Sequence, residues 1–465
     1  MQTNYYFIGA GGIGMANLER YLLSKGNVIG GYDKTPSPLT EELEREGVEI
    51  IYDDNPDLIS EKFKDPEKTT VVFTPAVPED SAVRRFFSSK GFRMIKRAAM
   101  LGDITRQTKS ICVAGSHGKT TTSSMTANIL RREGAPGCNA FLGGVLRETG
   151  SNLVLCKDAE WSVAEADEYD RSFHRLSPDI AIVTSVDPDH LDIYGDENGY
   201  LEGFAHFTSL IKPGGILLMH TGMKLKPVTG SDVRIMTYSG GKDGDWHAED
   251  IEFQAGKIRF TLVGPDGQRI TDVSPGVPVE INIDNAVAAG AAAWYAGASE
   301  DDIREGLSGF KGAKRRFETW LDGTDGLPVL IDDYAHSPNE VKASIRSVKK
   351  LYPDKRLSVI FQPHLYTRTR DFADGFAEAL SEADEVIMPE IYPARELPIE
   401  GVDSQMVLDK IRCEKKAFCP RKDLLNLIKN SNFEILMTLG AADIDLLLPD
   451  IKETLIKGKG NPGRR

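Results

Sequence analysis

The segment GSHGKTTT, Gly115 to Thr122, has the residue types and the setting of a loop that binds phosphate groups. It lies between an apolar run, SICVAG (110–115), and a sequence with helical character. Glycines let backbone N–H groups turn inward around phosphate oxygens, and the helix N-terminus adds partial positive charge. Lys119 is placed to reach the β- and γ-phosphates of a nucleotide, and the Thr120 hydroxyl suits Mg²⁺. The full pattern of such loops has a glycine where this chain has Val113, so we interpret the segment as a variant phosphate loop rather than an ordinary turn.

A second glycine-rich turn, GAGGIG (9–14), follows the apolar run NYYFIG. The spacing G-x-G-x-x-G after a strand, with Asp33 about twenty residues further on, is typical of folds that bind dinucleotides. Any ligand with a diphosphate uses the same loop, so the turn predicts a diphosphate-bearing nucleotide; the alternative is a turn that only permits close helix–strand packing. Asp33 suits either a contact with ribose hydroxyls or a cap on the next segment. The candidate contacts in the turn are Gly11, Gly12, Ile13 and Gly14.

Acidic and histidine side chains follow the ends of two further apolar runs, where doubly wound sheets bind their ligands. Glu165, in EADEYDRSF (165–173), is a candidate Mg²⁺ ligand, because Mg²⁺ takes few protein oxygens and shares those of phosphates. His190, in SVDPDHLDIYG (185–195), is a candidate metal or substrate contact. The other acidic residues of the first segment are expected to be solvated or to cap local backbone: Asp167, Glu168 and Asp170.

Two positions in the middle of the chain leave a structural and a functional interpretation open. Asn285 opens an Ala-rich helical sequence, DNAVAAGAAAWYAG, where an N-cap and a ligand contact are both reasonable. Arg315 and Arg316 lie at a junction between blocks of the sequence. An arginine there reaches a nucleotide only when domains close, and the alternative is a basic pair on the surface.

Two loops in the last third of the chain also follow predicted strands. DDYAHSP (332–338) offers Asp333 and His336, which suit nucleotide or metal contacts. FQPHLYTRTRD (361–371) offers His364 and Arg368. Arginines in such a loop suit a carboxylate or a phosphate, which they bind with two parallel hydrogen bonds; solvated positive charge is the alternative.

The elements that must position these residues form an α/β pattern in three blocks. The chain has 465 residues, too many for one ordinary core. Apolar runs alternate with helical sequences, which predicts parallel sheets. A β-rich stretch at 233–282, with a hairpin turn at GPDG (264–267), interrupts the alternation. We place the domains at 1–108, 109–312 and 313–465, and we expect the basic tail KGKGNPGRR to be disordered.

Composition restricts the setting of the protein. The formal net charge of −14 argues against a general nucleic-acid surface, because phosphate binding needs a basic face. The sequence shows no signal peptide and no apolar run of about 20 residues, so we expect a cytoplasmic protein without a membrane partner. The five scattered cysteines are expected to be free thiols in a reducing compartment.

The order of these motifs is more specific than any one of them. GAGGIGM, GSHGKTTT, EADEYD, DHLDIYG, DNAVAA, KRRFE, DDYAHSP, FQPHLYTRTRD and IYPAREL together resemble the Mur ligase family, from about residue 4 to residue 446. Within the family they are most similar to members that attach L-alanine to UDP-N-acetylmuramic acid. The resemblance implies an N-terminal Rossmann-like domain for the UDP-substrate, a central phosphate-loop ATPase domain and a C-terminal Rossmann-like domain.

The resemblance also implies an activity and its ligands. It implies ATP-dependent formation of an amide bond through an acyl phosphate, in peptidoglycan precursor synthesis for the cell wall, with ATP, Mg²⁺, UDP-N-acetylmuramic acid and L-alanine as ligands. It is compatible with a monomer or a weak homodimer. The alternatives are a relative that attaches a tripeptide to the same sugar nucleotide, an NAD-dependent dehydrogenase, and a nucleotide-binding regulatory protein.

Carried over by motif, the resemblance assigns roles to individual residues. The implied catalytic residues are Lys119, Glu165, His190, Arg316 and Asp333. The implied ATP contacts are Gly115, Ser116, His117, Gly118, Lys119, Thr120, Thr121, Asn285, Arg316 and His336. The implied substrate contacts are Gly11, Gly12, Ile13, Gly14, Asp33, His190, His364 and Arg368, and the implied metal ligands are Thr120, Glu165 and His190.

Four positions depart from the common family pattern. Ser116 replaces a threonine in the phosphate loop, and Ala288 and Ser337 stand where a second Asn and a second His are common. Leu365 stands where an arginine is frequent, which leaves Arg368 as the expected partner of the amino-acid carboxylate.

Overall fold

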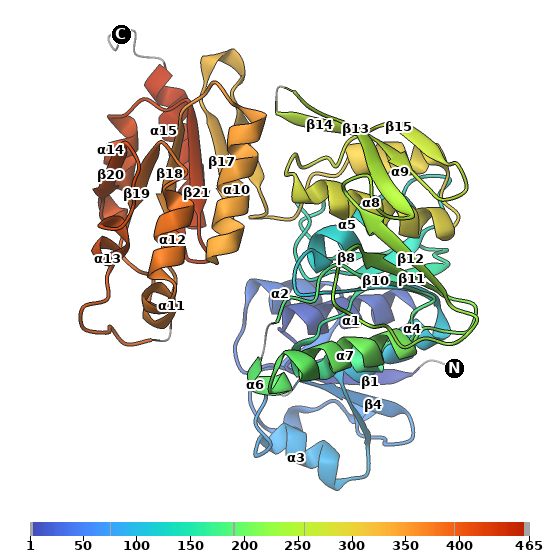
Figure 1. Cartoon of the computed structure of the whole chain (residues 1–465). Coiled ribbons are helices and arrows are strands. Elements are labelled where there is room, and N and C mark those ends of the chain that lie inside the picture. The colour runs from blue at the N-terminus through green and yellow to red at the C-terminus, as the bar shows by residue number, and fades with distance from the viewer. Residues whose placement is uncertain (1–2, 75, 189–190, 255, 395, 460–465) are drawn as a thin grey trace.

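The computed structural model describes residues 3–74, 76–188, 191–254, 256–394 and 396–459. Three sheets follow one another along the chain, each flanked by helices, and they form three α/β units (Figure 1). This confirms the predicted α/β class with alternating strands and helices. Within the described residues, no helix is both long enough and apolar enough to cross a bilayer.

The first unit contains a five-stranded parallel sheet with the order β3-β2-β1-β4-β5. The strand order reverses at β1, so the glycine-rich turn after β1 opens at the place where doubly wound sheets bind ligands. The strands are β1 Asn4–Ile8, β2 Val28–Tyr32, β3 Glu49–Ile51, β4 Thr69–Phe73 and β5 Arg93–Lys96. The helices are α1 Ile13–Ser24, α2 Pro38–Arg45, α3 Ala82–Ser89 and α4 Arg97–Gln107, with short 3₁₀ turns at Pro56–Leu58 and Glu61–Phe63.

The second unit contains a ten-stranded sheet with the order β15-β14-β13-β12-β11-β10-β6-β9-β7-β8. Strands β12 to β7 in this order are parallel, whereas β13-β14-β15 and β7-β8 pair antiparallel. The strands are β6 Lys109–Ala114, β7 Cys138–Phe141, β8 Leu153–Val154, β9 Trp161–Glu165, β10 Ile180–Val183, β11 Ile216–His220, β12 Arg234–Ser239, β13 Trp246–Gln254, β14 Lys257–Val263 and β15 Arg269–Val273. The helices are α5 Lys119–Leu130, α6 Leu191–Tyr194, α7 Glu197–Ser209, α8 Ile281–Tyr295 and α9 Glu300–Ser308, with a 3₁₀ segment at Tyr169–Arg175.

The third unit contains a six-stranded sheet with the order β16-β17-β21-β18-β19-β20, in which only the β16–β17 pair is antiparallel. The strands are β16 Glu318–Asp322, β17 Val329–Asp333, β18 Leu357–Phe361, β19 Glu385–Met388, β20 Lys415–Phe418 and β21 Ile435–Leu439. The helices are α10 Pro338–Leu351, α11 Tyr366–Asp371, α12 Ala373–Leu380, α13 Ser404–Leu408, α14 Leu424–Lys429 and α15 Leu448–Lys459, with 3₁₀ turns at Thr324–Gly326, Arg421–Asp423 and Ile444–Leu447.

Two sequence expectations about these elements need correction. Asn285 is not an N-cap, because α8 begins at Ile281 and includes Asn285. The tail was expected to be disordered from Lys457, but α15 continues through Lys459; residues 460–465 lie outside the described residues. The predicted hairpin turn at 264–267 does connect β14 and β15.

A half-buried lysine, Lys212, connects the first two units. Lys212 Nζ donates to the backbone oxygens of Thr105 at 2.9 Å and Thr108 at 2.8 Å, on the chain segment that joins the units. It also donates to Asp179 Oδ2 at 2.7 Å. A single apolar cluster includes Phe7 from the first sheet and Val183 from the second, so the two units share a core.

The connection between the second and third units is fixed on both of its sides. On the near side, Arg147 N donates to Gly312 O at 3.0 Å and Lys314 N donates to Val145 O at 2.9 Å. On the far side, Tyr334 N donates to Arg315 O at 2.7 Å. The Arg315 guanidinium also donates to backbone oxygens of the third unit: Ala442 O at 2.9 Å and Gly440 O at 2.5 Å.

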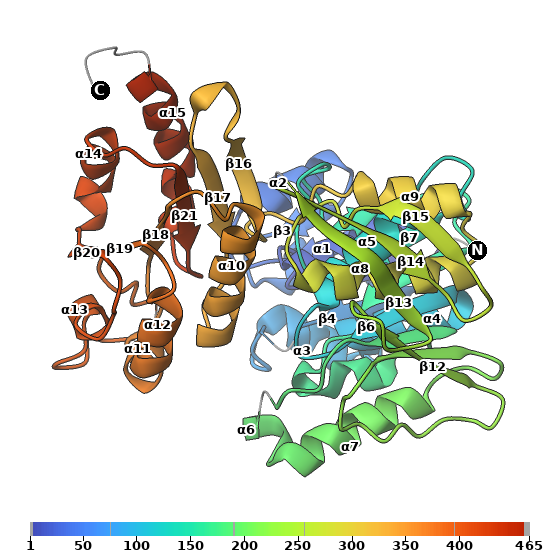
Figure 2. The ribbon, with the colours of Figure 1, turned by 45° about the horizontal axis from the view of Figure 1, so that its top comes forward.

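The third unit meets the second along α10, which lies on the side that faces the rest of the chain in both views (Figure 2). Lys350 on α10 pairs with Glu280 at 2.7 Å, and its ammonium lies 4.0 Å from the ring centre of Phe253 on β13. Arg147 donates to Thr319 O at 3.1 Å and pairs with Glu318 at 3.2 Å. These contacts are near the surface, and a single apolar cluster includes Phe310 from the second unit and Val341 from α10, so the two units also share buried apolar side chains.

Candidate active site

The phosphate loop connects the end of β6 to the start of α5. Gly115 and Gly118 have φ of +140° and +82°, a region that L side chains rarely adopt. A Cβ at Gly115 would lie 2.0 Å from Thr184 Oγ1, and one at Gly118 would lie 2.8 Å from Asn285 Oδ1. Both glycines are therefore required by conformation and by space. The tight turn places the loop backbone at the N-terminus of α5, where a phosphate is stabilised.

Hydrogen bonds between the phosphate loop and the segment that follows β10 fix the shape of the loop. Ser116 Oγ donates to Asp187 O at 2.5 Å and lies 2.9 Å from the Tyr200 hydroxyl. His117 N donates to Ser185 Oγ at 2.8 Å, and the His117 side chain is exposed. The serine at position 116 thus retains the hydroxyl contact that a threonine offers.

Lys119 lies across the loop and contacts a residue whose role the sequence analysis assigned wrongly. Its Nζ donates to Gly115 O at 2.5 Å and to Glu168 Oε1 at 2.8 Å. Glu168 was expected to be solvated or to cap backbone, but the residue is only 2% exposed. It is buried because its segment turns back beneath the loop, where its charge is paired with the lysine.

Thr120 and Glu165 face each other beside the loop. Thr120 Oγ1 lies 3.1 and 3.0 Å from the two carboxylate oxygens of Glu165, and Gly143 N donates to Oε2 at 2.9 Å. Burial raises the pKa of Glu165, and the nearby positive charge of Lys119 opposes that rise. A hydroxyl and a carboxylate at this distance are hard oxygen donors of the kind that Mg²⁺ takes together with phosphate oxygens and water.

The third expected metal ligand, His190, lies outside the described residues. In the part of the chain that the structure describes, no group of three or more His, Cys, Asp or Glu side chains is arranged to hold a metal ion. Thr120 and Glu165 alone fit the chemistry of a Mg²⁺ that is shared with a nucleotide, since such a site needs few protein ligands.

A cavity of about 470 Å³ opens on one side of the loop, beside Gly118. Asn285, on α8, lines this cavity. Its Oδ1 accepts from Thr122 Oγ1 at 3.1 Å, and its Nδ2 donates to Asn282 Oδ1 at 3.0 Å. Asn282, one turn earlier on the same helix, was not singled out by the sequence analysis, although a spacing of three residues places both amides on one face. Ala288 is fully buried among core side chains.

Two further residues of this cavity were missed by the sequence analysis. His220 Nε2 lies 2.9 Å from Asp284 Oδ1, and Gly240 N donates to the same oxygen at 2.6 Å. The hydrogen bond with Asp284 raises the pKa of His220, against the effect of its burial. His220 is the last residue of β11, so the strand-end argument that selected Glu165 was available for it too.

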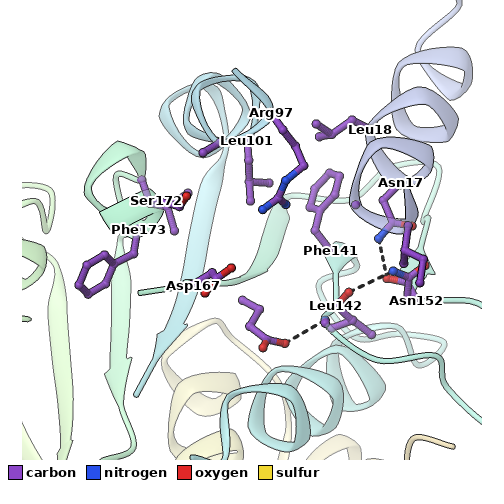
Figure 3. Close-up of a pocket in the computed structure, with 16 residues that line it drawn as sticks. Asn17, Leu18, Arg97, Leu101, Phe141, Leu142, Asn152, Asp167, Ser172 and Phe173 are labelled. Atoms are coloured by element: carbon purple, nitrogen blue, oxygen red, sulfur yellow. Dashed lines mark hydrogen bonds between the residues drawn. The ribbon is translucent and has the colours of Figure 1, made fainter. Parts of the chain in front are cut away.

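A cavity of about 400 Å³, which Glu165 lines, lies between the first and second units (Figure 3). Its walls carry Arg97 and Asp167, and Asn17 Nδ2 donates to Asn152 O at 3.2 Å. Ile13, from the glycine-rich turn, also lines it and is 58% exposed. Asp167 is half-buried at this cavity, and its Oδ1 accepts from Tyr169 N at 3.0 Å, so it caps local backbone as expected.

The glycine-rich turn after β1 opens into an adjoining cavity of about 630 Å³. Asp33 Oδ2 accepts from Gly11 N at 2.7 Å, so Asp33 holds the turn while it lines the cavity. Gly12 lines this cavity as well. Gly14 and Arg97 line both this cavity and the previous one, so the two cavities adjoin at these residues.

Three residues expected at the junction with the third unit do lie together. The Arg316 guanidinium is 5.6 Å from the ring centre of Tyr334, whose ring lies 5.1 Å from that of His336. Asp333 is buried and accepts a hydrogen bond from Ser344. Burial raises the pKa of Asp333, and the Ser344 hydroxyl and Arg316 counteract the rise.

His364 and Arg368 form a second group on the loop after β18. The His364 ring stacks on Tyr392 at 5.9 Å, and its Nδ1 is a buried nitrogen without a hydrogen-bond partner among the described residues. Burial lowers the pKa of His364, and Arg368 lowers it further. Leu365 precedes α11 with φ of +68°. The cavities of about 400 and 470 Å³ are lined by residues of the first and second units. The structure therefore does not bring His364 and Arg368 to the phosphate loop.

Comparison with known protein families gives three matches that together span most of the chain. They are the Mur ligase family catalytic domain at residues 4–109, the Mur ligase middle domain at 113–293, and the Mur ligase glutamate ligase domain at 315–435. The chain belongs to the Mur ligase family. The middle-domain match contains the phosphate loop, Glu165 and Asn285.

Similar Mur ligases have a specific name. The UDP-N-acetylmuramate–L-alanine ligase of Parabacteroides distasonis is 51% identical over 455 residues, which cover 98% of both chains. That of Phocaeicola vulgatus is 50% identical over 447 residues and 96% of both chains.

Solved Mur ligase structures have the same fold. UDP-N-acetylmuramate-alanine ligase MurC from Thermotoga maritima superposes with a TM-score of 0.76 at 25% identity, covering 98% of this chain and all of that one. A murein peptide ligase from Psychrobacter arcticus superposes with a TM-score of 0.60 at 23% identity over the full length of both chains. The second likeness concerns the fold alone.

Proposed function

We propose that this Mur ligase joins L-alanine to the carboxylate of UDP-N-acetylmuramic acid, with consumption of ATP, in peptidoglycan precursor synthesis. The observation that carries the proposal is the 51% identity, over nearly the whole length of both chains, to a ligase named for that reaction. The phosphate loop supports the ATP dependence, because its Gly118 lines a cavity directly before Lys119 and the N-terminus of α5.

The division of the chain at 1–108, 109–312 and 313–465 is part of the proposal. Each range contains one of the three sheets. The first unit takes the UDP moiety in the cavity beside Gly12 and Asp33, and the second takes ATP in the cavity beside Gly118 and Asn285. The substrate extends past Gly14 and Arg97, which line both adjoining cavities, so that its carboxylate lies near Glu165.

The chemistry follows from the charges beside the loop. The substrate carboxylate attacks the γ-phosphate of ATP, the β–γ phosphoanhydride bond breaks, and an acyl phosphate and ADP form; Lys119 stabilises the negative charge that develops on the phosphoryl oxygens. The amine of L-alanine then attacks the acyl carbon, which forms the amide and releases inorganic phosphate and a proton. Thr120 and Glu165 would hold Mg²⁺, with His190 as the further expected ligand, and a bound Mg²⁺ supplies charge neutralisation. Backbone N–H groups of residues 115–121, which include Ser116, His117 and Thr121, hold the phosphates.

The third unit completes the site when the units approach each other. Arg316, Asp333 and His336 lie where the chain enters this unit, so a small rotation changes their distance from the nucleotide. His364 stays uncharged near neutral pH because burial lowers its pKa, and its free Nδ1 suits the ammonium group of the incoming amino acid. Arg368 suits the amino-acid carboxylate. Exclusion of water protects the acyl phosphate until the amine attacks.

Phosphate release is the first measurement. Purified protein is given ATP and UDP-N-acetylmuramic acid, alone and with L-alanine, glycine, L-serine or the tripeptide. Release that needs both substrates, with L-alanine best, supports the proposal. Phosphate release with the tripeptide but not with L-alanine favours a ligase that attaches the tripeptide. No phosphate release with any acceptor contradicts the ligase assignment.

A loop variant tests whether the release depends on the assigned lysine. Lys119→Ala is expected to abolish turnover and to leave binding of the UDP-substrate intact, because the UDP cavity lies in the first unit. The control is Lys109→Ala, which removes an exposed lysine at the start of β6, the strand that precedes the phosphate loop. We further propose a cytoplasmic monomer or weak homodimer, which size-exclusion chromatography tests.

A further inference from the structure

The position of the Lys119 ammonium depends on oxygens of two residues from different segments. One is Gly115 O, within the loop itself, and the other belongs to Glu168, whose two carboxylate oxygens both lie 2.8 Å from Nζ. The side chains of Lys119 and Glu168 are 14% and 3% exposed. A charged pair at this depth is held in one geometry, unlike a surface pair, which solvent and salt weaken.

Glu168 is itself fixed by the backbone around it. Its carbonyl oxygen accepts from the Tyr194 hydroxyl at 2.7 Å and from Arg171 N at 3.0 Å. The next residues turn through Asp170 and Arg171, which both have positive φ. Tyr194 is buried, and the Arg171 guanidinium lies 5.1 Å from the centre of its ring. The carboxylate therefore has a rigid support that comes from the second unit alone.

Two carboxylates at the end of β9 have separate partners. Glu165 contacts the Thr120 hydroxyl and Gly143 N, whereas Glu168 contacts the lysine. Lys119 is near enough to Glu165 for the two charges to attract each other. Without Glu168, the ammonium has a carboxylate available at Glu165, which is the side chain that the proposed function needs for a cation.

We infer that Glu168 is a positioning residue: it holds the Lys119 ammonium at the phosphate loop and keeps it away from Glu165. The inference rests on the proposed function, in which Lys119 acts on ATP. Glu168 is expected to act through the lysine and not to touch the reacting atoms. Removing its charge leaves a lysine that is present but wrongly placed, and misplacement of a charged group by about 1 Å is enough to slow a reaction strongly.

The variants are Glu168→Gln, Glu168→Asp and the control Asp170→Asn. Asp170 lies two residues further on and carries the same charge, but its side chain is 61% exposed and its ion pair, at 3.9 Å, is with Lys96. Calorimetry measures the Kd of ATP, ADP and UDP-N-acetylmuramic acid for each variant, and steady-state assays measure KM for ATP and kcat. Thermal melting monitors folding.

Glu168→Gln is expected to weaken ATP and ADP binding, and to lower kcat/KM for ATP, by roughly 10- to 100-fold. Binding of the UDP-substrate should change by less than about twofold, as should every parameter of Asp170→Asn. Glu168→Asp restores the charge on a shorter side chain and should recover part of the loss. Wild-type nucleotide binding in Glu168→Gln would overturn the inference, as would an equal loss of UDP-substrate binding and melting temperature in both Glu168 variants.

A double-mutant cycle with Lys119→Ala separates positioning from general stability. If Glu168 acts through the lysine, Glu168→Gln should change the Kd of ADP by less than about twofold in the Lys119→Ala background. Additive losses would refute the inference. Wild-type protein that binds ADP but forms no amide would contradict the proposed function, and the double-mutant cycle could still be measured. Absence of any nucleotide binding would contradict both the proposed function and this inference.

Discussion

His220 and Asp284 form an ion pair in the wall of the cavity beside the phosphate loop, with 2.9 Å between Nε2 and Oδ1. The side chains are 34% and 23% exposed, so solvent screens part of their attraction. The hydrogen bond to Asp284 is the main reason that the pKa of His220 lies above its ordinary value. The pair therefore links the charge of this wall to pH.

Replacing His220 should change how thermal stability depends on pH. A histidine whose pKa is higher in the folded than in the unfolded chain stabilises the fold fully below the unfolded value of about 6.5, and this contribution is lost as pH rises through the folded value. The melting temperature of wild type should therefore exceed that of His220→Gln most at mildly acidic pH, and the gap should narrow with rising pH. Melting curves from about pH 5 to about pH 9 measure it. The control is His206→Gln, because His206 is exposed. A difference in melting temperature between wild type and His220→Gln that widens as pH rises would contradict the raised pKa of His220.

Residues with a recognisable local setting could be predicted from the sequence. Lys119 and Thr120 follow a glycine turn between a strand and a helix, and the structure places both at that turn. Glu168 could not be assigned, because its partner lies 49 positions away and the two meet only once the sheet has formed. A carboxylate in an acidic stretch is usually solvated, and only tertiary packing reverses that expectation.

At the scale of elements, two glycines on either side of α5 have different constraints. Gly118 precedes α5 with φ of +82°, and a Cβ there would meet Asn285 Oδ1 at 2.8 Å. Gly134, four residues beyond the end of α5, has a similar φ of +88°, but a Cβ there would meet nothing within 4 Å. A substitution at Gly134 therefore introduces backbone strain alone, whereas one at Gly118 introduces both backbone strain and crowding.

Gly118→Ala and Gly134→Ala should differ in their effect on ATP binding. Each substitution should cost about 1–2 kcal/mol of stability, because alanine is strained in the left-handed region. Only Gly118→Ala should also weaken ATP binding, since it pushes Asn285 and the loop apart. Thermal melting and calorimetry measure the two effects, and equal ATP affinity in both variants would refute this account of the loop.

The alternation of strands and helices was readable from the sequence, but the edges of the sheets were not. Strand β16 (ETWLD) pairs antiparallel with β17 and was not predicted, because its mixed polar and apolar residues look like a loop. Its position is determined by the pairing partner rather than by its own residues. The β-rich stretch was recognised, yet its continuation of the central parallel sheet through the β12–β13 pair depends on long-range contacts.

At the scale of the molecule, Lys212 holds the connection between the first two units. Its three contacts join the backbone at Thr105 and Thr108 to Asp179 in the second unit. Lys212→Met keeps the length of the side chain and removes the charge. It should cost about 1–3 kcal/mol and expose the connection at 105–109 to protease, because two carbonyl oxygens and a carboxylate lose their donor.

Melting temperature and limited proteolysis measure this effect. Lys224→Met, which removes an exposed lysine paired with Glu197, is the control and should be nearly neutral. A Lys212→Met protein that melts and resists protease like wild type would show that the shared apolar core holds the units without the lysine.

The doubly fixed connection between the second and third units has a kinetic consequence. Residues 312–314 are bonded to the second unit and Arg315 to the third, so the torsions between Lys314 and Arg315 join two segments that are fixed to different units. A long flexible tether lets a domain explore a large volume and dilutes its side chains to about millimolar effective concentration. A pivot of one peptide confines the arginine and histidine side chains of the third unit to an arc. In the proposed function, their approach to the phosphate loop is then a short rotational search with little entropy to lose.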